Sequence, residues 1–200
     1  MNTIRLKQYP KWKKLQFYML IIVILISFVI AIQAPLLSEN LSFIGNALHH
    51  RGLLVLWGTC TACYFWFAFL TISHLSALIP KRIALYCALA CLLMVIATIL
   101  PYDEGRVPML SFLHTAAAML GTGIYIACYW YCLFVYQSID YWFYRIAMSC
   151  YNLLLLFCLL LIATFASINT LAEILFSIVL PLLQYRFLCM QEQKGIPLTK

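Results

Sequence analysis

Histidine and carboxylate side chains gather in two polar segments that interrupt long apolar stretches of this chain. One segment runs from Ser38 to Gly52; the other runs from Pro101 to Pro108, with His114 a few residues beyond it. The ionisable groups concerned are Glu39, His49, His50, Asp103, Glu104 and His114. Imidazole with carboxylate is the usual donor set for zinc and some other transition metals, and it also supports acid–base catalysis. The residue types therefore allow either metal binding or proton transfer at a lipid headgroup.

A metal site would draw on five of these residues, namely His49, His50, Asp103, Glu104 and His114. A single haem between His114 and either His49 or His50 is a further alternative. A structural interpretation competes with both. Acidic loop residues are often only solvated, the adjacent pair His49 and His50 is not a ligand spacing on one helical face, and an interhelical hydrogen bond would satisfy His114.

The composition fixes the class of protein to which these residues belong. The chain has 200 residues, of which 66% are hydrophobic and only 10% charged, and its mean hydropathy is +0.97. A soluble domain of this size needs a charged shell that this composition cannot supply. Apolar runs of about twenty residues match the thickness of a bilayer's hydrocarbon core. We therefore expect an integral membrane protein with all-α architecture.

Six apolar runs predict six transmembrane helices in one domain covering residues 1–200. Their expected spans are 15–34, 52–79, 83–100, 108–137, 141–166 and 171–188. The first run is longer than the apolar part of a signal peptide and continues through Pro35 and Leu36, which predicts an uncleaved helix. Pro181 predicts a kink in the last helix.

The basic residues predict the orientation of this bundle. Eleven of the thirteen Lys and Arg residues fall on one side of the six spans: Arg5, Lys7, Lys11, Lys13, Lys14, Lys81, Arg82, Arg145, Arg186, Lys194 and Lys200. Only Arg51 and Arg106 fall on the other side, where four of the six acids and three of the four histidines also lie. Cytoplasmic segments are enriched in Lys and Arg, so we expect both termini in the cytoplasm and a multi-pass protein of the cell membrane. Basic clusters beside apolar runs are membrane anchors, so the net charge of +7 does not indicate nucleic-acid binding.

Polar and reactive residues within the predicted spans have structural rather than catalytic interpretations. Thr170 and Glu173 have the spacing of a capping box, which places Glu173 at the start of the last helix rather than at mid-membrane. Cys60 and Cys63 form a CxxC sequence inside a helix, where redox function is weakly indicated. The other cysteines in the spans behave as small apolar residues, and we expect no structural disulfide.

Two segments resemble a known family. Ser42-Phe43-Ile44-Gly45-Asn46, leading through Arg51-Gly52 to Gly58, resembles the Ser-x-Leu-Gly-Asn outer loop of certain six-helix proteins. Leu100-Pro101-Tyr102-Asp103 with His114 resembles their second outer loop. These are the bacterial membrane proteins of domain-of-unknown-function family 998. Their plan is similar to that of the superfamily with the damage-regulated autophagy modulators and a GPI-lipid remodelling factor. The resemblance implies six helices and a polar cluster facing outward, without an assigned reaction.

The leading hypothesis is an accessory membrane protein without enzymatic activity or cofactor, whose outer mouth binds a lipid or a protein partner. Its expected contacts are Ser42, Asn46, Arg51, Asp103, Arg106 and His114. The two guanidinium groups suit bidentate recognition of a lipid phosphate. A metal-dependent hydrolase acting on lipid amides or esters stays open as the alternative, and a single-haem protein as a second one.

Overall fold

The computed structural model describes residues 2–33, 35–46, 48–75, 79–103, 105–165 and 168–193. All regular secondary structure in these ranges is helical. The elements are α1 (Asn2–Ala31), α2 (Leu41–Asn46), α3 (Arg51–Leu75), α4 (Lys81–Ile99), α5 (Pro108–Val135), the 3-10 turn η1 (Tyr136–Ser138), α6 (Tyr141–Phe165) and α7 (Thr170–Gln193).

Six of these helices are long and apolar enough to cross a membrane, which confirms the predicted number. Their candidate spans are Lys11–Ala31, Arg51–Ser73, Lys81–Ile99, Pro108–Ser138, Tyr141–Phe165 and Thr170–Met190. Helix α1 begins at Asn2, well before the predicted membrane span of 15–34, because the basic segment continues the helix instead of preceding it. The sequence also gave no sign of α2, a helix of 6 residues.

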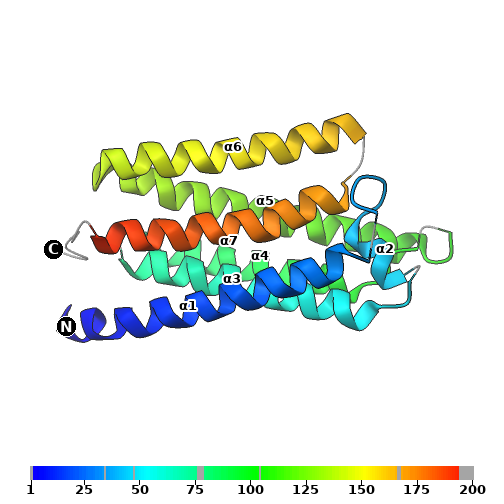
Figure 1. Ribbon diagram of the computed structural model, residues 1–200, viewed down its shortest axis with the longest axis horizontal. Coiled ribbons are helices and arrows are strands. Elements are labelled where there is room, and N and C mark those ends of the chain that lie inside the picture. The colour runs from blue at the N-terminus through cyan, green and yellow to red at the C-terminus, as the bar shows by residue number, and fades with distance from the viewer. Residues whose placement is uncertain are drawn as a thin grey trace.

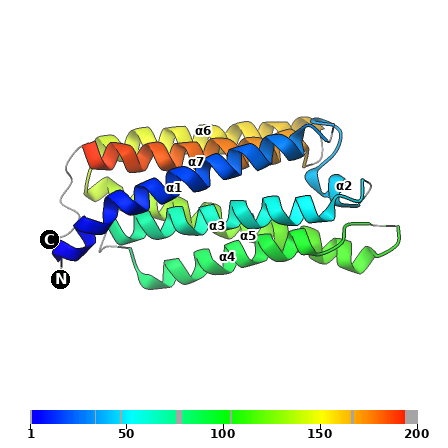
Figure 2. The ribbon, with the colours of Figure 1, turned by 60° about the horizontal axis from the view of Figure 1, so that its bottom comes forward.

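The long helices run side by side along the longest axis of the molecule (Figure 1). The start of α1 and the end of α7 lie at one end of the bundle, and α2 lies at the other (Figures 1 and 2). We call the latter the α2 end; it also holds the connections α1–α3, α4–α5 and α6–α7. Helix α1 packs along α3 and α7, while α4 packs along α3 and α5, and α6 packs along α7.

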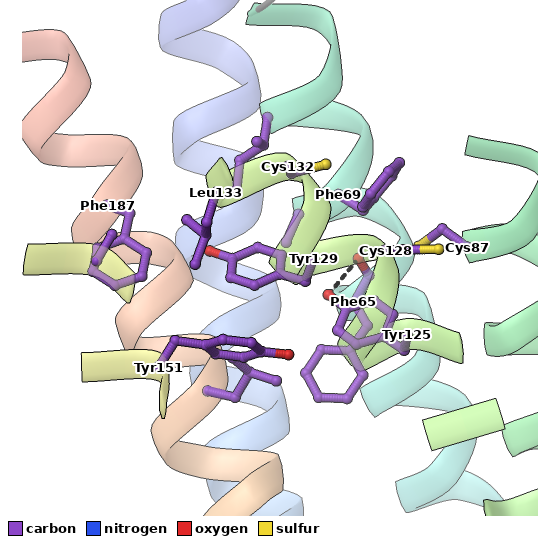
Figure 3. Close-up of a cluster of buried hydrophobic side chains, with 14 of the residues drawn as sticks. Phe65, Phe69, Cys87, Tyr125, Cys128, Tyr129, Cys132, Leu133, Tyr151 and Phe187 are labelled. Atoms are coloured by element: carbon purple, nitrogen blue, oxygen red, sulfur yellow. Dashed lines mark hydrogen bonds between the residues drawn. The ribbon is translucent and has the colours of Figure 1, made fainter. Parts of the chain in front are cut away.

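Aromatic side chains fill the interior between α3, α5, α6 and α7 (Figure 3). Phe65 stacks on Tyr125 with ring centroids 4.6 Å apart, and Tyr129 lies 5.2 Å from Tyr151. The Tyr125 hydroxyl donates to the Phe65 carbonyl at 3.2 Å and accepts a hydrogen bond of 2.7 Å from the Gln184 amide. Helix association in a bilayer depends on such packing and polar contacts, because lipid tails are as apolar as the side chains themselves.

The outer surface of the bundle is apolar, as lipid contact requires. Large exposed hydrophobic side chains lie on every long helix, including Leu25, Leu85, Phe112, Leu153 and Leu182. Outward-facing groups of this kind have no partner within the bundle, and the hydrocarbon of a membrane would surround them. Helix α7 runs through Pro181, whose carbonyl accepts a hydrogen bond of 2.8 Å from the Tyr64 hydroxyl.

Helices α4 and α5 approach each other closely at Gly121. A Cβ atom there would lie 2.9 Å from the Ala90 carbonyl oxygen and 3.1 Å from the Met94 backbone nitrogen. Small residues allow this kind of close contact between membrane helices. The α4–α5 pair holds the end of α4 against the start of α5, and both contribute to the site described below.

We predict that Gly121→Ala destabilises the protein by about 1–3 kcal/mol, because the added methyl group must push α4 and α5 apart. Gly123→Ala is the matched control on the same helix: nothing lies within 4 Å of its Cβ position, and alanine favours helix. Thermal unfolding in detergent measures both variants. Equal melting temperatures for the two variants would contradict the close packing inferred here.

Candidate functional site

Ser42 and His114 meet at the α2 end. The Ser42 hydroxyl oxygen lies 2.8 Å from His114 Nε2, although the two residues are 72 positions apart in the chain. His114 Nδ1 lies 2.6 Å from the Ala97 carbonyl oxygen and 3.3 Å from that of Leu100. A carbonyl oxygen can only accept, so Nδ1 carries the proton and donates it to both carbonyls. In the neutral ring Nε2 is then an acceptor, and the Ser42 hydroxyl donates to it.

The end of α4 explains why the imidazole is held there. The last carbonyl groups of a helix lack partners within the helix. The Ala97 carbonyl would normally accept from the residue four positions later, but that residue is Pro101, which has no N–H. His114, in the second turn of α5, supplies the missing donor. The ring of Tyr102 lies against the imidazole, with centroids 5.2 Å apart.

Arg51 is held by the same turn of α4. Its Nη2 donates to the carbonyl oxygen of Ile99, the last residue of α4, while the residue as a whole stays exposed. Arg51 is the first residue of α3, so this bond ties the start of α3 to the end of α4. The guanidinium has five N–H donors in total, and this bond uses one of them.

The second polar loop is organised by Asp103. Its Oδ1 accepts hydrogen bonds of 3.1 Å from the backbone N–H groups of Gly105 and Arg106, and its own N–H donates to the Ser111 hydroxyl at 2.8 Å. Arg106 Nε lies 3.7 Å from Asp103 Oδ2, in a pair whose arginine side chain is 90% exposed. Exposed pairs of this length contribute little to stability. Asp103 therefore shapes the loop, and the Arg106 guanidinium faces solvent.

Glu173 lies at the start of α7, as predicted, but the predicted capping box is wrong. Asn169 caps α7, because its Oδ1 accepts from the Ala172 N–H at 2.9 Å. Thr170 Oγ1 instead donates to the Glu39 carbonyl at 2.7 Å. The half-buried Glu173 carboxylate accepts a hydrogen bond of 2.6 Å from the N–H of Leu41, the first residue of α2. A carboxylate of α7 thus caps a different helix.

Two backbone hydrogen bonds extend this contact between the first loop and α7. The Thr170 N–H donates to the Glu39 carbonyl at 2.7 Å, and the Leu171 N–H donates to the Leu36 carbonyl at 2.8 Å. Beneath α2 lies a small apolar cluster of Ile30, Leu41, Ile44, Leu54 and Ile174. Together these contacts place Ser42 over His114, so that the two residues are only 6% and 7% exposed.

Gly45 allows α2 to lie against α3. A Cβ atom at Gly45 would come within 2.7 Å of Leu54 Cδ2. His49 follows with φ of 57°, in the left-handed region, and the His50 N–H donates to the Ile44 carbonyl at 3.1 Å. This compact turn leads directly into α3.

The described residues among those predicted for metal binding do not converge on one point. Across the part of the chain that the structure describes, no three His, Cys, Asp or Glu side chains are arranged to hold a metal ion. His49 and His50 are exposed, Asp103 is bonded within its own loop, and both ring nitrogens of His114 have hydrogen-bond partners. Glu104, the side chain of Asn46 and the side chain of His74 lie outside the described part. The described residues therefore offer no three-ligand metal site.

All nine cysteines are free thiols, in agreement with the expectation that disulfides do not build this fold. Cys87, Cys91, Cys128 and Cys132 are buried, and they belong to the helices α4 and α5 that pack closely together. Cys60 is half-buried, and Cys63 is exposed on α3.

Sequence reasoning named both Ser42 and His114 but did not foresee that they pair. It also missed Glu173 as the residue that fixes α2. One signal was available for His114: a proline four residues after Ala97 frees a carbonyl group near the start of the next helix. No comparable local signal marks Glu173, because its partner is 132 residues away.

The chain was compared with protein-family models, curated proteins and solved structures, and none of them matches it.

We predict that Glu173→Ala destabilises the protein by about 1–3 kcal/mol, because the Leu41 N–H loses its acceptor in a half-buried position. Glu173→Gln keeps an amide oxygen in the same place and should lose less. Thermal unfolding reports the stability, and hydrogen–deuterium exchange of residues 36–46 reports the order of α2. Exchange as slow in Glu173→Ala as in the unmodified chain would contradict the role assigned to this carboxylate.

Proposed function

We propose that this is a lipid-binding membrane protein that holds the phosphate-bearing headgroup of a membrane lipid at its α2 end. The observation that carries the proposal is the placement of two arginines, Arg51 and Arg106, on the exposed rim beside the His114 region. Both lie where apolar helices end and a headgroup layer would begin.

The state of the two guanidinium groups supports phosphate binding. Arg51 is anchored through a single N–H to the Ile99 carbonyl, so its direction is fixed while its other donors stay available. Among the described residues, Arg106 is paired with Asp103, at 3.7 Å and in solvent. A phosphate group can replace such a weak pair, because guanidinium binds phosphate through two parallel, charge-assisted hydrogen bonds.

The remaining residues expected to contact the lipid differ in their structural roles. Asp103 holds the Arg106 loop in shape, and the buried Ser42–His114 pair lies next to the end of α4 that anchors Arg51. Asn46 belongs to α2 by its backbone. A protein partner in the membrane is a second candidate for the same rim, and the lipid is favoured by the two arginines.

The orientation is part of the proposal. With the α2 end outside the cell, the basic residues at the opposite end face the cytoplasm, as the positive-inside rule requires. Both termini would then be cytoplasmic and the protein would belong to the cell membrane. The resemblance to family 998 implies the same outward-facing polar cluster.

We predict that green fluorescent protein fused to the C-terminus is fluorescent, while alkaline phosphatase fused there is inactive. The phosphatase fused after Arg106 should be active, because that loop would be outside. These reporters fold only on the cytoplasmic and external side respectively, so whole-cell fluorescence and phosphatase activity give the orientation. The reverse pattern would place the α2 end in the cytoplasm and overturn the assignment of the lipid layer.

We predict that the double variant Arg51→Gln/Arg106→Gln binds an anionic lipid at least about tenfold more weakly, since each lost charged hydrogen bond is worth roughly 1.5–3 kcal/mol. The measurement is titration of the purified protein in neutral detergent with short-chain phosphatidylglycerol. Binding to the unmodified chain should also weaken as salt is raised.

Arg82→Gln is the matched control, because it removes an exposed arginine at the opposite end of the bundle. Arg51→Lys tests the geometry separately, as it keeps the charge without the planar fork. An unchanged affinity in the folded double variant would rule out the proposed headgroup site.

A further inference from the structure

We infer that Ser42 is a nucleophile activated by His114, and that the α2 end can cleave an acyl ester of a membrane lipid. The choice of a lipid ester as substrate rests on the proposed function, whereas the activated serine does not. The inference starts from the protonation pattern that the hydrogen bonds impose.

The Ser42–His114 pair has the three parts that nucleophilic catalysis needs. The hydroxyl is 2.8 Å from Nε2, which is within reach for direct proton transfer. The Nδ1–H is bonded to the Ala97 and Leu100 carbonyls at 2.6 and 3.3 Å, which fixes both the tautomer and the direction of the ring. A nucleophile, a base and a group that orients the base form the general arrangement of activated serines; here backbone carbonyls take the place of a carboxylate.

The surroundings fit this chemistry better than they fit a purely structural bond. Both residues are nearly shielded from solvent, and such shielding strengthens electrostatic effects in the site. The last turn of α4 contacts both His114 and Arg51, through Ala97, Ile99 and Leu100. A phosphate held by Arg51 would therefore lie at the same end of α4 as the imidazole, and the glycerol esters of the same lipid could extend toward Ser42.

The reaction runs in two balanced steps. In the first, Ser42 Oγ bonds to the acyl carbonyl carbon while its proton passes to His114 Nε2. The carbon–oxygen bond to the lipid alcohol then breaks, and the alcohol leaves with the proton from Nε2. In the second, a water molecule gives a proton to Nε2 and attacks the acyl-serine, which releases the fatty acid and returns the proton to Ser42. Water is the only co-reactant.

Access to the pair depends on α2. This short helix covers His114 and is held by the Glu173 carboxylate and by the apolar cluster around Ile44. Ser42 belongs to α2 itself, so an acyl chain entering from the membrane must bring its carbonyl carbon to the hydroxyl while α2 keeps Ser42 against His114. The probe used in the test should therefore carry a long alkyl chain.

The test is labelling of the full chain in detergent with a neutral alkyl fluorophosphonate, which reacts with activated serines and has no anionic headgroup for the arginines to bind. Mass spectrometry locates the adduct. We expect an adduct on Ser42, none in Ser42→Ala, and labelling at least about 100-fold slower in His114→Gln, because the general base is lost. Glutamine can still bond to Ser42, so a merely structural histidine would be replaced with little change.

Ser177→Ala is the matched control. Ser177 is another buried serine, bonded to the Ile174 carbonyl and to Ser27 rather than to a histidine, and its removal should leave the Ser42 adduct unchanged. Melting temperatures confirm that each variant is folded. Failure of Ser42 to label in the folded chain, or labelling of His114→Gln at the original rate, would overturn the inference.

The phosphatidylglycerol titration separates this inference from the proposed function. Labelling of Ser42 without lipid binding would keep the activated serine and reject the headgroup site. Lipid binding without labelling would keep the headgroup site and reject the activated serine. When both hold, release of fatty acid from phosphatidylglycerol, lost in Ser42→Ala, identifies the ester as the substrate; labelling without such release would reject the lipid ester.

Discussion

The contact between the first loop and α7 is the constraint on which the α2 end depends. Helix α2 has too few residues to be stable alone, and its first N–H groups need acceptors that the helix itself cannot provide. The Glu173 carboxylate provides one, and the bonds from Thr170 and Leu171 to the loop hold the chain on the other side. A bond between a backbone N–H and a carboxylate is stronger than one between neutral groups. Without it, α2 would lose a main contact that holds Ser42 above His114 and would depend on the apolar cluster beneath it.

The same need for hydrogen-bond partners explains the other half of the site. A backbone carbonyl that is buried away from water is costly when it has no hydrogen-bond donor, and Ala97 is buried. Pro101 removes the donor that Ala97 would have used, and the end of α4 leaves the Ile99 carbonyl open as well. His114 and Arg51 satisfy these groups from α5 and α3. The polar chemistry of the α2 end thus arises where helices end, and the tautomer of His114 is a consequence of where α4 stops.

The sequence could predict the six spans because one physical quantity, the thickness of the bilayer, sets their length and composition. It could also place Ser42, Arg51, Asp103 and His114 at one end, since the loops alternate between the two sides. It could not predict which of them touch. The pairing of Ser42 with His114 and of Leu41 with Glu173 depends on residues 72 and 132 positions apart, and no local pattern records such contacts. The capping-box spacing predicted that Thr170 and Glu173 bond to each other's backbone. Both side chains bond instead to residues of the first loop, Thr170 to Glu39 and Glu173 to Leu41.

Other buried hydroxyl groups of the bundle show what distinguishes the α2 end. Ser27 bonds to Trp57 Nε1 at 3.0 Å, and the Tyr125 hydroxyl accepts from the Gln184 amide at 2.7 Å. In these pairs neither partner can take a proton from the hydroxyl near neutral pH, so they stabilise helix contacts and nothing more. The partner of Ser42 is an imidazole with its Nε2 lone pair directed at the hydroxyl. A hydrogen bond that served only packing would not require a partner able to accept the Ser42 proton. Because His114 can accept it, we place reactivity at the α2 end rather than in the aromatic core.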